Sequence, residues 1–222
     1  MTQRSAEQAM EAPGAEALLL IAPGCPHCPA MLEILGRMVK AGEIAELRVA
    51  NVAAKPALAA RLGVRSVPWL KLGPYELTGA RSYAEIKEWL SRLSAAGGMA
   101  DYLHLLLKEG RLDAAQGLLQ NGAALWADLL PILANPEAAM NVRLGANALL
   151  EGQAASAALA GLLPQFRQLA RHADARVRAD ACYFLGLSAR PEAQPALAAA
   201  LHDADAEVRD IAAEALAQVR QE

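Results

Sequence analysis

Short apolar runs and helical patterns alternate through the first half of the chain. The run ALLLIA at residues 17–22 ends at a Pro-Gly pair, and its length favours a strand buried on both faces over a helix. After Cys28, apolar residues recur at helical spacing until Gly42, a residue placed to end a helix. The apolar positions of that helix are Met31, Leu32, Leu35, Met38 and Val39. The motif CPHC at residues 25–28 therefore lies where a strand leads into a helix.

The pattern that follows is typical of a small α/β domain. Four further elements are predicted: a strand over 46–52, a short helix over 55–63, a hairpin over 64–80 and an amphipathic helix over 82–93. Ser82 and Glu85 have the spacing of a capping box, which marks the start of the last helix. Together these elements predict one α/β domain over residues 15–96.

The second half of the chain has a helical period throughout, and its sequence repeats. Three segments share a Val-Arg pair, an Ala four residues after the Val and a Leu eight residues after it: NVRLGANALL from Asn141, RVRADACYFL from Arg176 and EVRDIAAEAL from Glu207. At these spacings Val, Ala and Leu lie on one helix face, with the Arg beside it. The repeats are 35 and 31 residues apart, which leaves room for a helix pair in each. Residues 99–122 are predicted to form a further helical hairpin, so an all-α domain is expected over residues 99–222.

Composition excludes several classes of protein. Of the 222 residues, 55% are hydrophobic and 20% are charged, which rules out a disordered chain, collagen and a small disulfide-rich domain. The net charge of -3 argues against a basic surface, so nucleic acid is not an expected partner. The first 97 residues carry a net charge of +2 and the remaining 125 carry -5, so the two halves differ in charge as well as in pattern.

The N-terminal sequence lacks the pattern of an export signal. The apolar run at residues 17–22 is six residues long, shorter than the roughly 7 to 15 that an export signal needs, and three Glu precede it. No apolar run approaches the length of about 18 residues that a membrane span needs. We therefore expect a mobile extension over residues 1–14 and a cytoplasmic protein, in which a Cys pair is more often catalytic or metal-binding than structural.

The motif CPHC carries the candidate chemistry of the first domain. A Cys at the first turn of a helix faces free backbone N–H groups and the positive end of the helix dipole, and both favour the reactive thiolate. Two residues separate Cys25 from Cys28, so the sulfurs are close enough to form a disulfide. We expect Cys25 to attack a substrate disulfide and Cys28 to resolve the mixed disulfide. Pro26 suits the first helical position, where its missing N–H has no intrahelical partner to lose.

His27 lies between the two cysteines and has three possible roles. It can stabilise the thiolate by its charge or by a hydrogen bond, which makes the disulfide a stronger oxidant, or it can be a solvated residue with no role. It could also join the two thiolates as a metal ligand. Zinc sites usually have four ligands, and the only other cysteine, Cys182, lies in the helical half. No metal and no cofactor are therefore predicted.

The first domain resembles the thioredoxin superfamily over residues 15–94. The resemblance rests on the order of strand, CxxC, helix, strand and helix, followed by the sequence SVPW at residues 66–69, which leads into a strand. It implies that the Val67-Pro68 peptide bond is cis and lies beside the CxxC. It also implies that Val67 and Pro68 contact the substrate.

Gly24 and Pro26, which flank Cys25, are further substrate contacts that the resemblance implies. Thioredoxins have Trp at the position of Gly24, and the Pro-His dipeptide is similar instead to that of the periplasmic disulfide-forming oxidases of the superfamily. Leu19 stands where thioredoxins have a buried Asp that assists proton transfer, and Pro29 is more similar to the compact glutaredoxin-like branch. The leucine at position 19 argues against fast, thioredoxin-like turnover.

The helical domain resembles HEAT repeats, especially the short bacterial type. Its second and third repeats have Asp174 and Asp205 three residues before the repeated Val, whereas the first has Ala139. The resemblance implies a short stack of helix pairs, because one pair alone cannot bury its apolar face. Its function would be to bind a protein partner on a concave surface, and the alternative is a stabilising appendage. Cys182 falls on or beside the packed face and is expected to be a buried core thiol.

The sequence thus predicts an α/β, thioredoxin-like domain followed by an all-α domain, a short HEAT-type α-solenoid. The favoured function is a thiol-disulfide oxidoreductase that acts on protein disulfides or dithiols through Cys25, Cys28 and His27, with repeats that bind the protein partner. An unidentified thiol or disulfide system would recycle the pair, and no membrane takes part. The alternatives are a redox-sensing adaptor and an assembly chaperone, both with a thioredoxin-like fold and little turnover.

Overall fold

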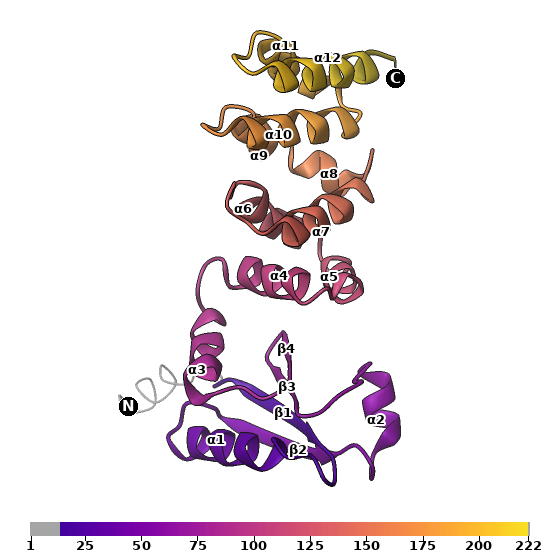
Figure 1. The fold of residues 1–222 in the computed structure, drawn as a ribbon. Coiled ribbons are helices and arrows are strands. Elements are labelled where there is room, and N and C mark those ends of the chain that lie inside the picture. The colour runs from indigo at the N-terminus through magenta and orange to yellow at the C-terminus, as the bar shows by residue number, and fades with distance from the viewer. Residues whose placement is uncertain (1–13, 222) are drawn as a thin grey trace, which may run out of the picture. The chain divides into compact units, whose positions relative to one another are not determined.

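The computed structural model describes residues 14–221, which form two compact units. The first unit ends at Ala96 and the second begins at Gly97 (Figure 1). The extension that the sequence predicts over residues 1–14 lies outside the described residues, except for Gly14. Within the described part of the chain, no helix is long and apolar enough to cross a membrane.

The first unit is built on a mixed sheet of four strands: β1 (Glu16–Ile21), β2 (Glu46–Asn51), β3 (Trp69–Leu72) and β4 (Tyr75–Thr78). Their order is β2-β1-β3-β4, with β1 parallel to β2 and antiparallel to β3, and with β3 antiparallel to β4. Leu19 and Leu20 of β1 point to opposite faces of the sheet, and both are fully buried. The prediction of a strand buried on both faces is therefore confirmed.

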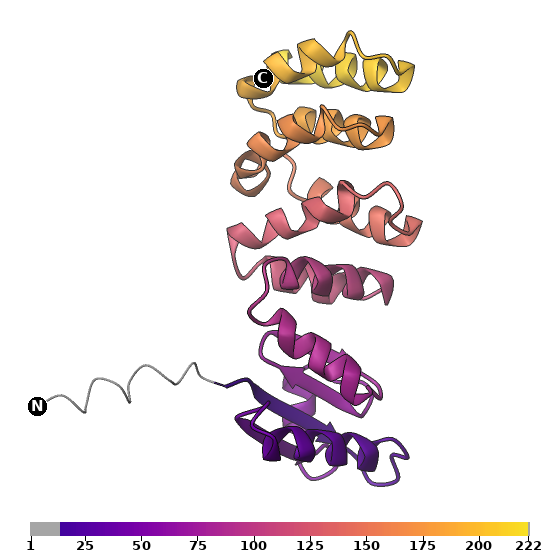
Figure 2. The same ribbon diagram turned by 90° about the vertical axis from the view of Figure 1, so that its left-hand side faces the viewer.

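Three helices cover the two faces of this sheet: α1 (Cys28–Lys40), α2 (Pro56–Arg61) and α3 (Tyr83–Arg92). On one face, Leu58 and Leu62 of the α2 region pack against the buried cluster that contains Leu20. The other face is covered by α1 and α3, which lie together in Figure 2. The backbone N–H of Arg81, just before α3, donates to Met31 Sδ of α1 at 3.2 Å. The CPHC motif therefore lies between the central strand and a helix that is packed along its length.

The start of α3 is fixed by the predicted capping box. Ser82 Oγ accepts from the Glu85 backbone N–H at 3.3 Å, and Glu85 Oε2 accepts from the Ser82 backbone N–H at 2.8 Å. These hydrogen bonds to Ser82 lower the pKa of the Glu85 carboxyl, because they stabilise its charged form. The capping box is thus confirmed and ties the last helix of the unit to the loop before it.

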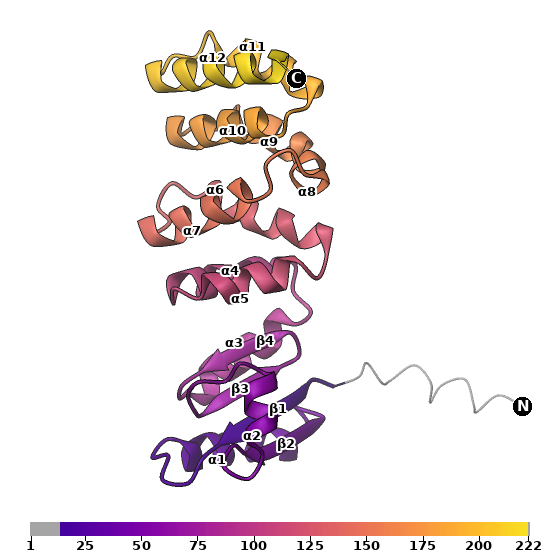
Figure 3. The same cartoon turned by 90° about the vertical axis from the view of Figure 1, so that its right-hand side faces the viewer.

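The described part of the second unit is helical throughout (Figure 3). Its helices are α4 (Gly98–Lys108), α5 (Leu112–Leu119), η2 (Ala123–Leu129), α6 (Leu130–Leu133), α7 (Met140–Glu151), α8 (Ala157–Gly161), α9 (Leu163–Leu169), α10 (Ala175–Leu187), η3 (Pro191–Ala193), α11 (Gln194–Ala200) and α12 (Ala206–Gln221). The hairpin predicted over 99–122 is formed by α4 and α5. The three repeated segments fall on α7, α10 and α12, and α9 and α11 pack beside α10 and α12 respectively.

The repeated Val, Ala and Leu form the packed face that the sequence predicts. None of the nine is more than 5% exposed: Val142, Ala146, Leu150, Val177, Ala181, Leu185, Val208, Ala212 and Leu216. Phe166 of α9 stacks on Phe184 of α10, with ring centroids 5.3 Å apart. Between repeats, a Cβ at Gly186 would lie 2.7 Å from Cβ of Ala215, so α10 and α12 approach at a distance that only glycine permits.

The Asp of the second and third repeats caps the helix that carries the packed face. Asp174 Oδ1 accepts from the backbone N–H groups of Arg176 and Val177 at 2.9 and 3.2 Å. Asp205 makes the corresponding bonds at the start of α12, at 2.9 and 3.3 Å. Ala139, at the same position before α7, has no side chain that can accept. The spacing between Asp and Val in these repeats is therefore that of a helix N-cap.

The repeated Arg ties each of these helices to the loop that precedes it. Arg178 Nη1 donates to the backbone carbonyls of His172 and Ala173, both at 2.9 Å. Arg209 makes the same two bonds, to carbonyls five and six residues before it, at 3.0 and 2.8 Å. Arg143 donates to the backbone carbonyls of Leu133, the last residue of α6, and Asn135, in the loop before α7. The side chain beside the packed face thus satisfies loop carbonyls that would otherwise lack a donor.

Two of these arginines also join consecutive repeats. Arg178 is bidentate to Asp203 of the next repeat, with Nε to Oδ2 at 2.8 Å and Nη2 to Oδ1 at 2.7 Å. This pairing lowers the pKa of Asp203 and raises that of Arg178. Arg143 pairs with Asp180 of the following repeat, where burial nevertheless raises the pKa of the carboxyl. Consecutive repeats are therefore linked by partly buried ion pairs as well as by apolar packing.

Candidate active site

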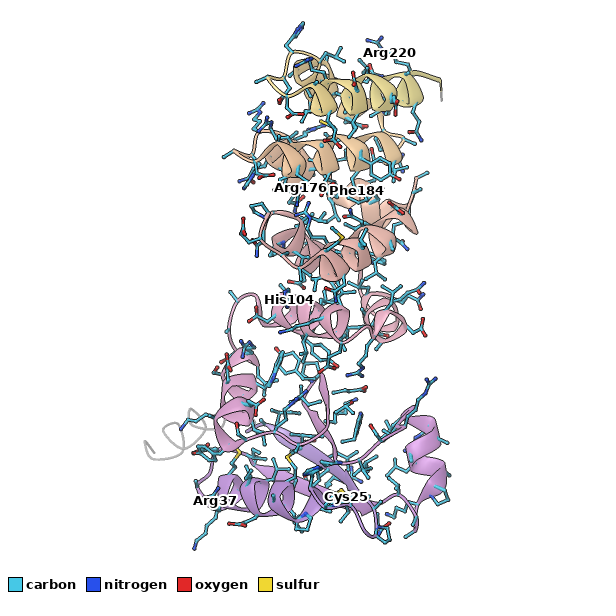
Figure 4. All side chains as sticks on the ribbon, in the orientation of Figure 1. Cys25, Arg37, His104, Arg176, Phe184 and Arg220 are labelled. Atoms are coloured by element: carbon cyan, nitrogen blue, oxygen red, sulfur yellow. A yellow bond between two sulfur atoms is a disulfide. The ribbon has the colours of Figure 1, made fainter. Side chains whose placement is uncertain are left out.

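The two cysteines of the CPHC motif are joined in the structure. Cys25 Sγ and Cys28 Sγ are bonded at 2.11 Å, and their Cα atoms are 5.5 Å apart, a spacing ordinary for a disulfide. β1 ends at Ile21, and Cys28 is the first residue of α1. Figure 4 labels Cys25 beside this end of α1. The motif therefore bridges the strand and the helix at the place that the sequence predicts.

The position of Pro26 within this junction differs from the prediction. The helix begins at Cys28, so Pro26 lies in the turn before it, and Pro29 is the proline in the first helical turn. Both prolines fit the rule that Pro is tolerated at a helix start. The conformation of the turn determines that Pro29, and not Pro26, lies in the first helical turn. Cys25 also precedes the helix, yet its bond to Cys28 holds its sulfur at the amino end of α1. The helix dipole can therefore still stabilise a thiolate there.

The two sulfurs differ in their exposure to solvent. Cys25 is partly exposed, whereas Cys28 is 5% exposed and belongs to the buried face of α1. Pro26 and His27 are both exposed, and His27 is the N-cap residue of α1 without a side-chain capping bond. Gly24 is exposed in the preceding turn with φ +73°, a conformation that favours glycine. Cys25 is therefore the more accessible of the two cysteines.

The Val67-Pro68 loop lies at the same end of the sheet as the disulfide. Trp69, the first residue of β3, pairs with Leu20 near the end of β1, from which the chain continues to the CPHC motif. The Val67-Pro68 peptide bond is cis, as the resemblance implies. Val67 is partly exposed and Pro68 is buried. The register of the strands thus brings together two segments that are about 40 residues apart in the sequence.

Leu32 lies at this end of α1. It shares the apolar helical spacing of the residues around it, but it is 40% exposed. Met31 and Leu35, on either side of it in the pattern, are buried. Five apolar residues in this stretch are too many for one face, and that excess was the available signal. Leu32 lies one helical turn after Cys28, so it adds apolar surface near the disulfide.

The position of the thioredoxin carboxylate is apolar in this chain. Leu19 is fully buried in β1, between Val49 of β2 and Leu70 of β3. A leucine cannot accept or donate a proton, so this position provides no group for proton transfer. Among residues 14–221, no three or more His, Cys, Asp or Glu side chains form a cluster that could hold a metal ion.

Cys182 lies in the core of the second unit, as expected. Its side chain is fully buried in α10, and burial, together with the nearby Asp203 carboxylate, raises the pKa of the thiol to about 11. A thiol with that pKa is almost entirely protonated at neutral pH. Cys182 is therefore a packing residue of its repeat rather than a third reactive cysteine.

We expect Cys182 to resist alkylation in the folded, reduced protein. After reduction, iodoacetamide at pH 8 should modify Cys25 first and leave Cys182 unmodified for hours, because the thiol is buried and protonated. Peptide mass spectrometry over time distinguishes the three sites, and denaturation in urea provides the control in which Cys182 reacts fully. Modification of native Cys182 at the rate of Cys25 would show that α10 opens readily.

Comparison with protein families agrees with this architecture. Residues 16–91 match the family model of a thioredoxin domain, and residues 163–222 match the family model of HEAT repeats. The first match spans the sheet, the CPHC motif and the cis proline, and the second spans the last two repeats. No curated protein matches the sequence. Residues 16–91 are thus a thioredoxin-like domain, and HEAT repeats follow it C-terminally.

Proposed function

We propose that this protein is a thiol-disulfide oxidoreductase that acts on protein substrates through Cys25 and Cys28. The observation that carries the proposal is the pair itself: two sulfurs at bonding distance at the amino end of α1, one partly exposed and one buried. A redox pair needs one thiol that a substrate can reach and a second that the substrate cannot. The thioredoxin-like fold supports the proposal, since it supplies the cis proline at the same end of the sheet.

The reaction follows from these roles. The Cys25 thiolate attacks one sulfur of a substrate disulfide, and the other substrate sulfur leaves as a thiolate and takes up a proton. Cys28 then loses its proton and attacks Cys25 Sγ, which forms the Cys25-Cys28 disulfide and releases the second substrate thiol. The substrate gains two electrons and two protons, and the enzyme loses them. The reverse sequence oxidises a substrate dithiol.

The substrate contacts extend this proposal to four flanking residues. Gly24 and Pro26 flank Cys25 in the sequence, and the Val67-Pro68 loop lies at the same end of the sheet, so an extended substrate segment would lie between the two. Val67 would pair with that segment through its backbone, as a strand pairs with a sheet edge. The helical repeats would bind a separate part of the same partner.

Trapping of the mixed disulfide tests the proposal directly. With Cys28 replaced by serine, the second step cannot occur, so oxidised insulin should accumulate as an adduct on Cys25 that dithiothreitol releases. Mass spectrometry of the adduct identifies the attached cysteine. The matched control carries Cys25→Ser as well and should form no adduct. An adduct through Cys182, or none at all, would contradict the assignment.

His27 is expected to raise the reduction potential of the pair. Replacing it with alanine removes a side chain that can stabilise the Cys25 thiolate, so the reduced form is less favoured and the disulfide becomes a weaker oxidant. We expect the equilibrium constant with glutathione to change about tenfold, or about 30 mV toward more negative potential. Redox titration in glutathione buffers measures it, with His202→Ala as the control. A reduction potential of the His27→Ala variant that is unchanged or more positive would show that His27 does not stabilise the Cys25 thiolate.

A redox-sensing adaptor is the second candidate, and Leu19 favours it. Without a buried carboxylate at that position, proton transfer to and from Cys28 is slow, and the pair would switch between states rather than turn over. Such an adaptor would bind a partner with different affinity in its two states. Equal partner affinity of the oxidised and reduced protein would eliminate it.

A further inference from the structure

Three arginines line three adjoining hollows on the second unit. Arg167 of α9 borders all three, which measure about 720, 400 and 390 Å³. Arg171, just after α9, borders the first two, and Arg190, just before η3, borders the third. Pro195 of α11 also lines the second hollow. The residues that line the hollows therefore come from α9 and from the start of the next repeat.

This part of the unit is positive although the unit as a whole is acidic. Residues 163–193 contain five Arg and three Asp or Glu, a net charge of +2. The rest of residues 98–222 contains five Lys or Arg and twelve Asp or Glu, a net charge of -7. A positively charged region is not needed to keep an acidic unit soluble, because the acidic surface already provides solubility. It fits a partner of negative charge.

None of the three arginines is used in the ion pairs that join the repeats. Arg178, in the same segment, is bidentate to Asp203. Arg167, Arg171 and Arg190, by contrast, form no ion pair with any carboxylate of the described residues. Arg171 and Arg190 are exposed to solvent.

One contact orients the central guanidinium. Arg167 Nη2 donates to the backbone carbonyl of Glu192, which fixes the guanidinium between the hollows. A guanidinium has five N–H donors, so most of those on Arg167 remain for a ligand. Of the described residues that line the hollows, Glu192 alone is acidic. The net charge of the lining therefore remains positive.

We propose that these hollows bind an acidic, extended segment of a partner protein. Guanidinium groups bind carboxylates in bidentate fashion, and three of them along neighbouring hollows match several Asp or Glu side chains of one extended segment. Nucleic acid fits less well. The described residues that line the hollows include no Phe, Tyr or Trp on which a base could stack. This inference rests on one part of the proposed function, the binding of a protein partner by the repeats, and it specifies the charge of that partner.

The test uses a fluorescein-labelled, cysteine-free peptide of ten Glu interrupted by Gly. Fluorescence anisotropy measures its binding to the full chain carrying Cys25→Ser and Cys28→Ser, so disulfide exchange plays no part and failure of the proposed redox function leaves the result unaffected. At about 50 mM salt we expect Arg171→Glu with Arg190→Glu to raise the Kd at least tenfold. Arg220→Glu, a single charge reversal at an exposed position of α12, should alter it less than twofold. Arg167 is left in place because it bonds to Glu192.

Each remaining outcome is decisive. Unchanged affinity in the double variant, or equal binding of a peptide with Gln in place of Glu, would overturn the proposal. Tighter binding of a fifteen-residue oligothymidylate that the double variant abolishes would show a nucleic-acid surface and overturn the choice of partner. If the double variant unfolds, as far-UV circular dichroism would show, Arg171→Gln with Arg190→Gln replaces it and should still raise the Kd at least fivefold.

Discussion

A chain with serine in place of Cys25 is expected to lose disulfide exchange with protein substrates, with a rate at least about 1000-fold lower than that of the unmodified chain. A serine oxygen cannot form the sulfur-sulfur bond of the mixed disulfide, so the first step has no nucleophile. Cys28 cannot replace it, because its side chain is only 5% exposed and a protein substrate cannot reach it. The rate of insulin reduction, followed by precipitation of the released chains with dithiothreitol as electron donor, measures the loss.

Two matched variants show whether the loss is specific. Cys182→Ser should keep the full rate, because that thiol is buried in the other unit. Cys28→Ser should still form the first mixed disulfide but fail to turn over. If Cys25→Ser kept more than a tenth of the rate, the reacting sulfur would lie elsewhere, and the chaperone alternative, which needs neither thiol, would gain support.

The sequence predicted the features of this site that follow from residue spacing, but not those that depend on the conformation of the turn before α1. The pattern placed CPHC between a strand and a helix, and the resemblance supplied the cis bond before Pro68; both are confirmed. It put Pro26 at the helix start, although the helix begins two residues later. Both Pro26 and Pro29 satisfy the local rule, and the choice depends on how the turn packs, which a single sequence does not record.

In the second unit, too, features of a single helix could be predicted from the sequence, whereas contacts between repeats could not. The Val, Ala and Leu spacing predicted the packed face because that face is a property of one helix. The roles of the arginines depend on how repeats stack. Arg178 finds its carboxylate in the next repeat, whereas Arg171 finds none among the described residues. The repeat pattern singles out Arg178, which follows Val177, but it does not show which arginines pair with a carboxylate, so the basic hollows emerged only from the structure.

Replacing Arg143 with methionine is expected to destabilise the second unit by about 3 to 5 kcal/mol, which is typical when one partner of a buried ion pair is removed. Arg143 is 7% exposed, pairs with Asp180 and donates to the carbonyls of Leu133 and Asn135 at 3.2 and 3.0 Å. Methionine fills a similar volume but leaves all three acceptors without this donor. The free energy of unfolding in urea, followed by Trp126 fluorescence with the two other tryptophans replaced by phenylalanine, measures the effect.

The pH dependence of this loss identifies its cause. Burial already raises the pKa of Asp180 in the folded state, although Arg143 and Arg176 oppose it, and removal of Arg143 raises it further. A carboxyl with a raised folded pKa destabilises the fold above that pKa, and the penalty is relieved as the pH falls through it. The loss should therefore be smaller at pH 5 than at pH 8.

Adding Asp180→Leu to Arg143→Met should recover part of the lost free energy of unfolding at pH 8, because no unpaired charge then remains buried. Arg220→Met, on exposed α12, should change the free energy by less than about 0.5 kcal/mol. A loss from Arg143→Met below about 1 kcal/mol, or one that does not vary with pH, would show that apolar packing alone holds these repeats together.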